Sequence, residues 1–128
     1  MRVFIVDDST VVVERLAQLL AEVPGAELIG RAGDVPEALQ AIRKTKPDAL
    51  ILDLQMPGGS GLDVLRAIRG DYPYLHILIC TNYPYPQYRE QCFFAGANFF
   101  LDKSAEFGKI PAILSELIQK EVNSPAKG

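Results

Sequence analysis

Residues 49–53 read Ala-Leu-Ile-Leu-Asp, a run of four apolar residues that ends on a carboxylate. A strand so short and so apolar is typical of a parallel sheet that is covered on both faces, because none of its side chains then meets water. Four more runs of strand length flank it, two on each side. We predict strands at residues 3–6, 27–30, 49–52, 75–80 and 98–101.

Stretches of helical period separate the predicted strands. Apolar residues recur every three or four positions in residues 12–20, 38–42, 62–68 and 110–118, and a shorter helix fits residues 88–95. Asp34 or Pro36 can open the second helix, and Pro47 ends it. Ser60 can cap the third helix, and Gly96 suits a helix terminus. Five repeats of strand and helix predict an α/β fold with one doubly wound, five-stranded parallel sheet.

Length and charge narrow the classes of protein. The 128 residues fit one domain, which we place at residues 1–122, with a tail or the start of a linker at residues 123–128. The net charge of −3, without a basic run, argues against direct nucleic-acid binding. Cys80 and Cys92 lack metal-ligand spacing and predict reduced thiols. With no signal-peptide pattern or membrane-length apolar run, we expect a cytoplasmic protein without a membrane partner.

Polar side chains gather where the predicted strands end. Asp7 and Asp8 follow the first strand, and Asp53 follows the third. Thr81 follows the fourth strand, and Lys103 comes two residues after the fifth. Ligands of open parallel sheets bind beyond the carboxyl ends of the strands. If the first and third strands are neighbours, three carboxylates crowd one pocket, and Mg²⁺ is the cation that suits their oxygens. With an ammonium and a hydroxyl beside them, the set suits phosphoryl transfer to a carboxylate.

Each of these residues also has an ordinary structural interpretation. A single Asp after a strand is usually a helix cap or a turn former, and the same holds for Thr81. Lys103 taken alone is a solvated lysine. A shared site is favoured because five polar groups stand at four strand ends on the same predicted edge.

The same residues carry a resemblance to a known family. The motifs are Val6-Asp7-Asp8, Asp53-Leu54-Gln55-Met56-Pro57-Gly58 with Gly61, then Thr81, and finally Gly96-Ala97 followed by Phe100 and Lys103. In this order the sequence resembles the response-regulator receiver domain of bacterial two-component systems, from Arg2 to about Glu121. The resemblance implies a flavodoxin-like (βα)5 fold, as in chemotaxis receivers, with strand order 2-1-3-4-5.

The resemblance also implies a magnesium-dependent phosphoacceptor. Asp53 would accept the phosphoryl group from a phosphohistidine on a sensor histidine kinase or a phosphotransfer protein. Asp8 and Asp53 would ligate Mg²⁺ directly with the backbone carbonyl of Gln55, while Asp7 would act through water. The domain would catalyse its own phosphotransfer and slow dephosphorylation, and would not otherwise be an enzyme.

A switch is implied as well. Lys103 would pair with Asp53 and then with a phosphoryl oxygen. Thr81 would move inward to bond the phosphoryl group, and Phe100 would follow it into the vacated space. The signal would reach a downstream effector, or a second copy of the chain, through the surface of the fourth helix, fifth strand and fifth helix.

The sequence departs from the family pattern at three positions. Ser104 follows Lys103 where many receivers have proline, which leaves open whether that peptide bond is cis. The switch aromatic is Phe100 and not the commoner Tyr, so no hydroxyl marks its position. Asn82, followed by Tyr83, stands directly after Thr81, where a small residue is often found.

Two other features allow more than one interpretation. Tyr83, Tyr85 and Tyr88 form a proline-rich entry to the fourth helix, either as local packing with Pro86 starting the helix or as a contact surface. His76, the only histidine, is interpreted as an ordinary strand-end residue.

Two rival classes of protein fit the predicted sheet. A hydrolase with an aspartyl nucleophile usually carries a second acid two residues later, where this chain has Gln55. A flavin-binding electron carrier needs a phosphate-cradling loop after the first strand, where Asp7 and Asp8 would repel the phosphate.

Overall fold

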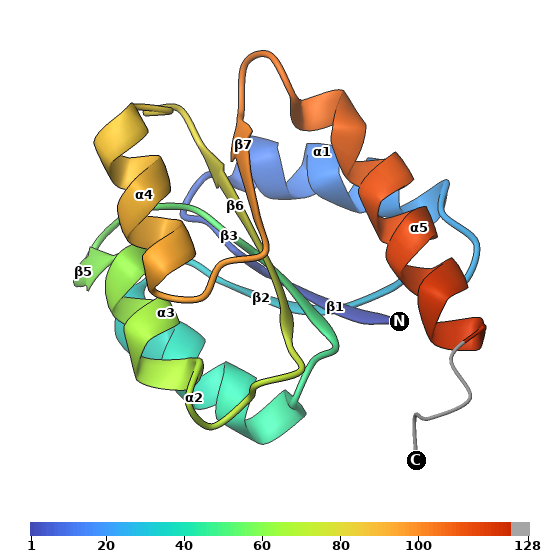
Figure 1. Ribbon diagram of the computed structural model, residues 1–128, viewed down its shortest axis with the longest axis horizontal. Coiled ribbons are helices and arrows are strands. Elements are labelled where there is room, and N and C mark those ends of the chain that lie inside the picture. Colours follow the sequence, from blue (N-terminus) through green and yellow to red (C-terminus); the bar gives the residue numbers. More distant parts are fainter. Residues whose placement is uncertain (124–128) are drawn as a thin grey trace.

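The computed structural model describes residues 1–123, which build a five-stranded parallel sheet in the order β2-β1-β3-β6-β7 (Figure 1). The strands are β1 (Arg2–Val6), β2 (Glu27–Ala32), β3 (Ala49–Leu52), β6 (His76–Thr81) and β7 (Phe99–Asp102). Because β6 and β7 are the fourth and fifth strands of this sheet along the chain, the predicted class and the predicted order 2-1-3-4-5 are confirmed. The predicted residues 124–128 of the tail lie outside the described residues.

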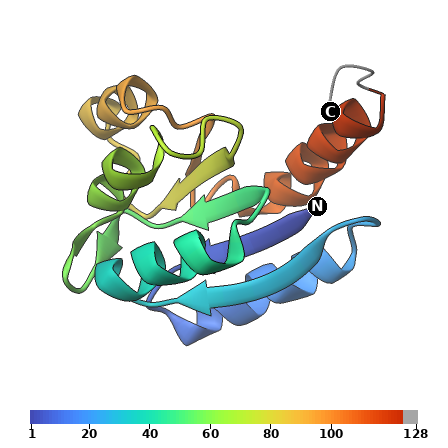
Figure 2. The same ribbon diagram turned by 90° about the horizontal axis from the view of Figure 1, so that it is seen from below.

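Helices cover both faces of the sheet (Figures 1 and 2). They are α1 (Thr10–Ala21), α2 (Val35–Thr45), α3 (Gly61–Ile68), α4 (Pro86–Phe94) and α5 (Ile110–Val122), with a short 3-10 turn η1 (Phe107–Lys109) before α5. α1 and α5 lie on one face, and α2, α3 and α4 lie on the other. Within residues 1–123, no helix is long and apolar enough to cross a membrane.

The sheet separates two hydrophobic cores. Leu50 and Leu52 of β3 belong to the core under α2, α3 and α4, whereas Ala49 and Ile51 belong to the core under α1 and α5. All four are at most 2% exposed. Each Leu or Ile buried in this way contributes about 1.5–3 kcal/mol to folding. Because successive side chains of β3 enter opposite cores, all of residues 49–52 are apolar. Burial on both faces also makes β3 a rigid support for Asp53, the residue that follows it.

Helix ends follow the signals in the sequence. The Asp34 carboxylate accepts a hydrogen bond from the backbone N–H of Glu37 at the start of α2. Ser60 and Asp63 form a reciprocal capping box at the start of α3. After α4, Gly96 has a φ of 109°, a left-handed value that glycine adopts without strain.

α4 differs from the other helices because it buries very little. It begins at Pro86, as the packing interpretation of this segment predicted and two residues before the start of the predicted range 88–95, since the fixed φ of proline suits the first helical position. Cys92 is its only fully buried residue, while Phe93 is 39% and Phe94 is 96% exposed. The helix therefore presents aromatic side chains to solvent.

A small antiparallel hairpin that the sequence did not predict follows β3. Its strands are β4 (Gln55–Met56) and β5 (Gly59–Ser60). The hairpin leads the chain back so closely that a Cβ on Gly61 would lie 2.1 Å from the backbone oxygen of Asp53. Only glycine fits there. The backbone at Asp53 is thereby fixed by β3 on one side and by the start of α3 on the other.

Candidate functional site

The backbone hydrogen bonds between neighbouring strands continue for one residue beyond the ends of β3 and β7. The N–H of Asp53 donates to the carbonyl of Val6, the residue at the end of neighbouring β1, over 2.9 Å. The N–H of Lys103 donates in the same way to the carbonyl of Thr81 over 2.8 Å. Because β1, β3, β6 and β7 are neighbours in the sheet, their carboxyl ends bring Asp7, Asp53, Thr81 and Lys103 to one edge. The sequence predicted this convergence.

Three carboxylates meet at this edge. Oxygens of Asp7, Asp8 and Asp53 all lie within 4.8 Å of one another. Asp7 and Asp53 are buried, at 3% and 5% exposed, whereas Asp8 is exposed. Hard cations such as Mg²⁺ take carboxylate and carbonyl oxygens, and Mg²⁺ keeps several waters, which the solvent-facing side at Asp8 can supply. The donor set therefore fits a magnesium ion.

Lys103 provides the positive charge of the site. Its Nζ lies 2.7 Å from Asp7 Oδ2 and 3.3 Å from Asp53 Oδ2, and its side chain is 8% exposed. The pairing with Asp53 is the one that the sequence implied; the shorter contact, with Asp7, was not foreseen. Asp7 Oδ1 also accepts the backbone N–H of Ser9 over 2.8 Å, so both oxygens of Asp7 have a protein partner.

Burial and charge act in opposite directions on the titration of the site. Burial raises the pKa of Asp53, and the negative charge of Asp7 raises it further. Lys103 and a backbone hydrogen bond from Gln55 lower the pKa of Asp53, but the net pKa stays above its ordinary value. Burial alone would lower the pKa of Lys103, but its contacts with Asp7 and Asp53 outweigh that effect and raise it. Lys103 therefore stays positively charged. Its charge offsets only part of the cost of burying the ionised carboxylate of Asp53.

The two residues of the implied switch are both buried. Thr81, at the end of β6, is fully buried, and its Oγ1 accepts the backbone N–H of Tyr83 over 3.0 Å. Phe100 is 5% exposed and belongs to the core under α2, α3 and α4. Both residues of the implied switch therefore take inward positions in this structure. All peptide bonds within residues 1–123 are trans, including the one between Lys103 and Ser104.

Other residues singled out in the sequence lie away from the carboxylates or on the rim of the site. Gln55, Asn82 and Tyr83 are exposed. Cys80 and Cys92 are buried, and burial raises the pKa of Cys80 to about 12 and that of Cys92 to about 11. Their thiols are therefore protonated and unreactive at neutral pH.

The aromatic entry to α4 forms a chain of ring contacts. The rings of Tyr83 and Tyr85 have centroids 6.4 Å apart, and those of Tyr85 and Tyr88 are 5.8 Å apart. Tyr83 and Tyr85 are 44% and 52% exposed, while Tyr88 packs partly against the core. The cluster thus combines the two interpretations that the sequence left open, with its inner end packed and its outer end available for contact.

Sequence reasoning missed Ser9 and gave no structural reason for Gly61, although both residues shape the site. Ser9 caps α1 with its hydroxyl and holds Asp7 with its N–H. Gly61, which the family motif contains, is required because its neighbour is the backbone of Asp53. The sequence did hold a signal for Ser9: it stands two residues after Asp7, where a helix is predicted to begin, and Ser is a preferred N-cap. The close approach at Gly61 depends on the hairpin and has no such local signal.

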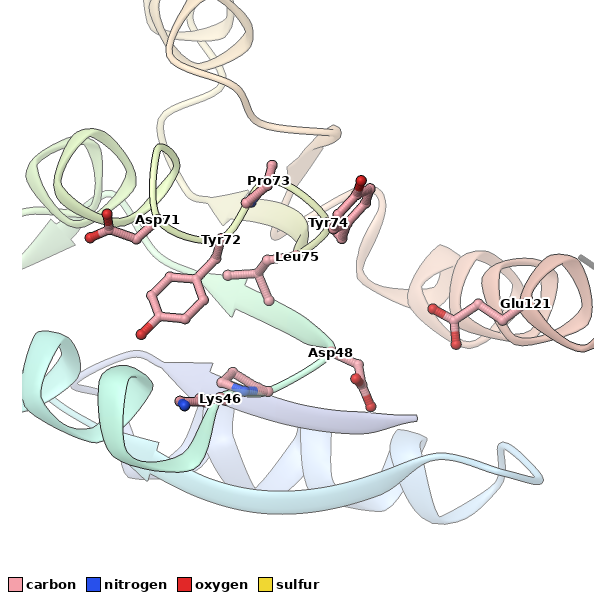
Figure 3. A pocket seen from close by; sticks show the side chains of 9 residues that line it. Lys46, Asp48, Asp71, Tyr72, Pro73, Tyr74, Leu75 and Glu121 are labelled. Carbon is pink, nitrogen blue, oxygen red and sulfur yellow. The ribbon is translucent and has the colours of Figure 1, made fainter. Parts of the chain in front are cut away.

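A hollow of about 300 Å³ lies at the opposite, amino edge of the sheet (Figure 3). Tyr72, Tyr74 and the carboxylates of Asp48, Asp71 and Glu121 are among its lining residues. Each carboxylate there has a partner: the N–H of Arg2 for Asp48, the guanidinium of Arg43 for Asp71, and His76 Nε2 at 3.1 Å for Glu121. His76 begins β6 at this edge, as its interpretation as a strand-end residue predicted.

Comparison with known proteins agrees with this geometry. The family model described as the response regulator receiver domain matches residues 3–115. The chain therefore belongs to the receiver-domain family of two-component response regulators.

Relatives with different outputs contain the matching region. The DNA-binding transcriptional activator DevR/DosR of Mycobacterium tuberculosis is 34% identical over 102 residues, which cover 80% of this chain and 47% of that protein. A protein-glutamate methylesterase/protein-glutamine glutaminase of Anaeromyxobacter dehalogenans is 43% identical over 81 residues, which cover 63% of this chain and 22% of that protein. The chain thus spans half or less of the length of these two curated relatives.

Solved structures share the whole fold. A LuxR-family two-component response regulator from Aurantimonas sp. aligns with a TM-score of 0.80 at 32% identity, over 94% of this chain and 84% of that chain. A chain of the CheX–CheY–BeF3–Mg complex from Borrelia burgdorferi aligns with a TM-score of 0.84 at 25% identity, over 92% and 89% of the two chains.

Proposed function

We propose that Asp53 of this receiver domain accepts a phosphoryl group from a sensor histidine kinase or a phosphotransfer protein, with Mg²⁺ as cofactor. The observation that carries the proposal is the placement of Asp53 at the end of β3, beside two further carboxylates and 3.3 Å from the ammonium of Lys103. We infer that residues 1–122 form the receiver unit and act in the cytoplasm as a switch, not as a turnover enzyme.

The transfer needs only a positioned nucleophile and compensated charge. A carboxylate oxygen of Asp53 forms a bond to phosphorus, the P–N bond of the phosphohistidine breaks, and the imidazole leaves with the bonding electrons. Lys103 is held by Asp7 within reach of Asp53, and it can move its contact from the carboxylate to a phosphoryl oxygen without leaving the site.

The contacts of Asp7 support the proposed assignment of the metal ligands. Asp7 uses one oxygen for Ser9 and the other for Lys103, which supports a role through water. Asp8 and Asp53, with the backbone carbonyl of Gln55, would then hold Mg²⁺ directly. A bound Mg²⁺ neutralises the carboxylates and the incoming phosphoryl oxygens.

We propose that the signal leaves through Thr81 and the surface formed by α4, β7 and α5. The Thr81 hydroxyl accepts the N–H of Tyr83, so a phosphoryl group that engages this hydroxyl would alter the segment that leads into α4. The exposed aromatic side chains of α4 support a contact with an effector or a second copy of the chain. One relative is named as a DNA-binding transcriptional activator and another as a methylesterase, which supports an output that depends on what the surface contacts.

The test is phosphorylation by acetyl phosphate in the presence of Mg²⁺. We expect the mass of one phosphoryl group to be added and to be lost on treatment with hydroxylamine. The Asp53→Asn variant and the chelated wild type should remain unlabelled, while Asp34→Asn, which keeps its helix-capping ability, should label normally. Labelling of Asp53→Asn equal to the wild type would refute the assignment.

A further inference from the structure

Arg89 of α4 lies against both aromatic residues that flank it. Its guanidinium carbon is 5.0 Å from the ring centroid of Phe93 and 5.9 Å from that of Phe100. Its Nη1 also donates to the backbone carbonyl of Phe100 over 3.5 Å. A guanidinium within about 6 Å of a ring centroid is attracted by the negative face of the ring. One exposed side chain thus contacts the buried ring, the strand that carries it, and a ring on the surface of α4.

These contacts determine the position of Arg89 because no carboxylate competes for it. Within residues 1–123, no carboxylate forms an ion pair with Arg89. Phe100 belongs to the same hydrophobic core as Ile79, Cys92 and Ala97. Core packing and the guanidinium of Arg89 therefore both act on this ring.

We propose that Arg89 is a positioning residue that favours the buried position of Phe100 over its exposed position. The inference rests on the proposed function only in that it treats Phe100 as the switch residue of the site. Since the same guanidinium lies on Phe93, which is 39% exposed, it links the buried ring to the partner-facing side of α4. A partner that covers Phe93 would then shift Phe100, and the coupling acts equally in both directions.

The expected effect of Arg89 is modest but measurable. A cation–π contact at an exposed site changes an equilibrium by about two- to fivefold. Removing Arg89 should raise the ratio of exposed to buried Phe100 by that factor. Arg89→Lys should fall between the wild type and Arg89→Gln, because an ammonium keeps the charge but loses the planar stacking of the guanidinium.

The experiment uses 4-fluorophenylalanine placed at position 100 and fluorine NMR exchange measurements on the unphosphorylated protein. Arg89→Gln should increase the exposed population of the probe about two- to fivefold. Glu90→Gln is the matched control on the next residue of the same helix and should leave that population unchanged. Phe93→Leu should raise it less than Arg89→Gln does, since it removes only the outer ring under the guanidinium.

An exposed population that is the same in the wild type, Arg89→Lys and Arg89→Gln would overturn the proposal. So would an equal rise in Glu90→Gln, because the effect would then belong to the helix and not to the guanidinium. Repeating the series in the Asp53→Asn background separates the Arg89 proposal from the proposal that Asp53 is the phosphoacceptor. The effect of Arg89 on the exposed population should persist in that background, whether or not Asp53 accepts a phosphoryl group. Loss of the Arg89 effect in that background would also count against the proposal.

Discussion

The charged side chains at the two edges of the sheet differ in their exposure to solvent. At the amino edge, charged side chains pair in solvent, as Arg43 and Asp71 do with side chains 47% and 61% exposed. At the carboxyl edge, Asp7, Asp53 and Lys103 are all less than 9% exposed and depend on one another. With Asp8, the three carboxylates and one ammonium leave a formal charge of −2. That is the charge that a divalent cation neutralises, which supports our proposal that the functional site lies at the carboxyl edge and not in the hollow at the amino edge.

The largest contrast should come from removing one cation at each edge. Lys103→Met leaves two buried carboxylates without their partner, which typically costs about 3–5 kcal/mol of folding stability. Arg43→Gln breaks a solvent-exposed pair and should leave the unfolding midpoint nearly unchanged. Urea denaturation of both variants, without divalent cations, measures the difference. Equal destabilisation by the two substitutions would remove the distinction between the edges.

The tight backbone under Asp53 can be tested with two glycines. Gly61→Ala forces its new methyl group against the backbone of Asp53 and should destabilise the fold by about 1–3 kcal/mol. It should also slow phosphorylation, because the nucleophile is displaced. Gly70→Ala is the control, since nothing lies within 4 Å of its Cβ position. A Gly61→Ala protein as stable and as readily phosphorylated as the Gly70→Ala protein would show that the backbone there is not constrained.

We expect the lifetime of the phosphoryl group on Asp53 to depend on the exposed residues beside Thr81. Asn82 and Tyr83 are exposed beside Thr81, and neither is a carboxylate that could orient an attacking water. If they narrow the approach by about 1.4 kcal/mol, hydrolysis is tenfold slower, and the phosphorylated state should last minutes or longer. We expect faster loss of phosphate from the double variant Asn82→Ala, Tyr83→Ala. Decay of the wild type within seconds, or no acceleration in the variant, would contradict a guarding role.

A smaller effect should appear in the pH dependence of stability. The pKa of Asp53 is raised in the folded protein, so the stability linked to this group is present below its unfolded pKa and is lost as pH rises through the folded value. Asp53→Asn removes the ionisable group, so the variant does not show this decrease in stability with rising pH. The variant should therefore gain in melting temperature relative to the wild type as pH increases from about 4 to about 7 in the presence of chelator. A difference that does not change with pH would mean that the burial of Asp53 is without consequence.

How much of this could be predicted from the sequence depends on the range of the interactions. β3 was located correctly because all four of its residues are apolar, and the caps at Asp34 and Ser60 are local signals. The convergence of Asp53 and Lys103 on one edge followed from the order of the strands. All of these depend on periodicity or on neighbours in the chain.

What could not be predicted depends on side-chain packing between distant segments. Adjacent Asp7 and Asp8 have opposite exposure, and the closest partner of Lys103 is Asp7 and not Asp53. The buried position of Phe100 and its contact with Arg89 are set by how α4 lies on β7. No pattern in one sequence encodes such contacts.

The most direct test of the central claim is the effect of Mg²⁺ on thermal unfolding of the wild type and of Asp8→Ala. Without metal, Asp8→Ala should be more stable than the wild type, because it relieves the crowding of three carboxylates. With Mg²⁺, the wild type should gain melting temperature and Asp8→Ala should gain little, since binding to the folded state alone is stabilising. Asp7→Ala should keep more of the magnesium response than Asp8→Ala does. A metal-free Asp8→Ala protein less stable than the wild type, with an undiminished response to Mg²⁺, would contradict the account.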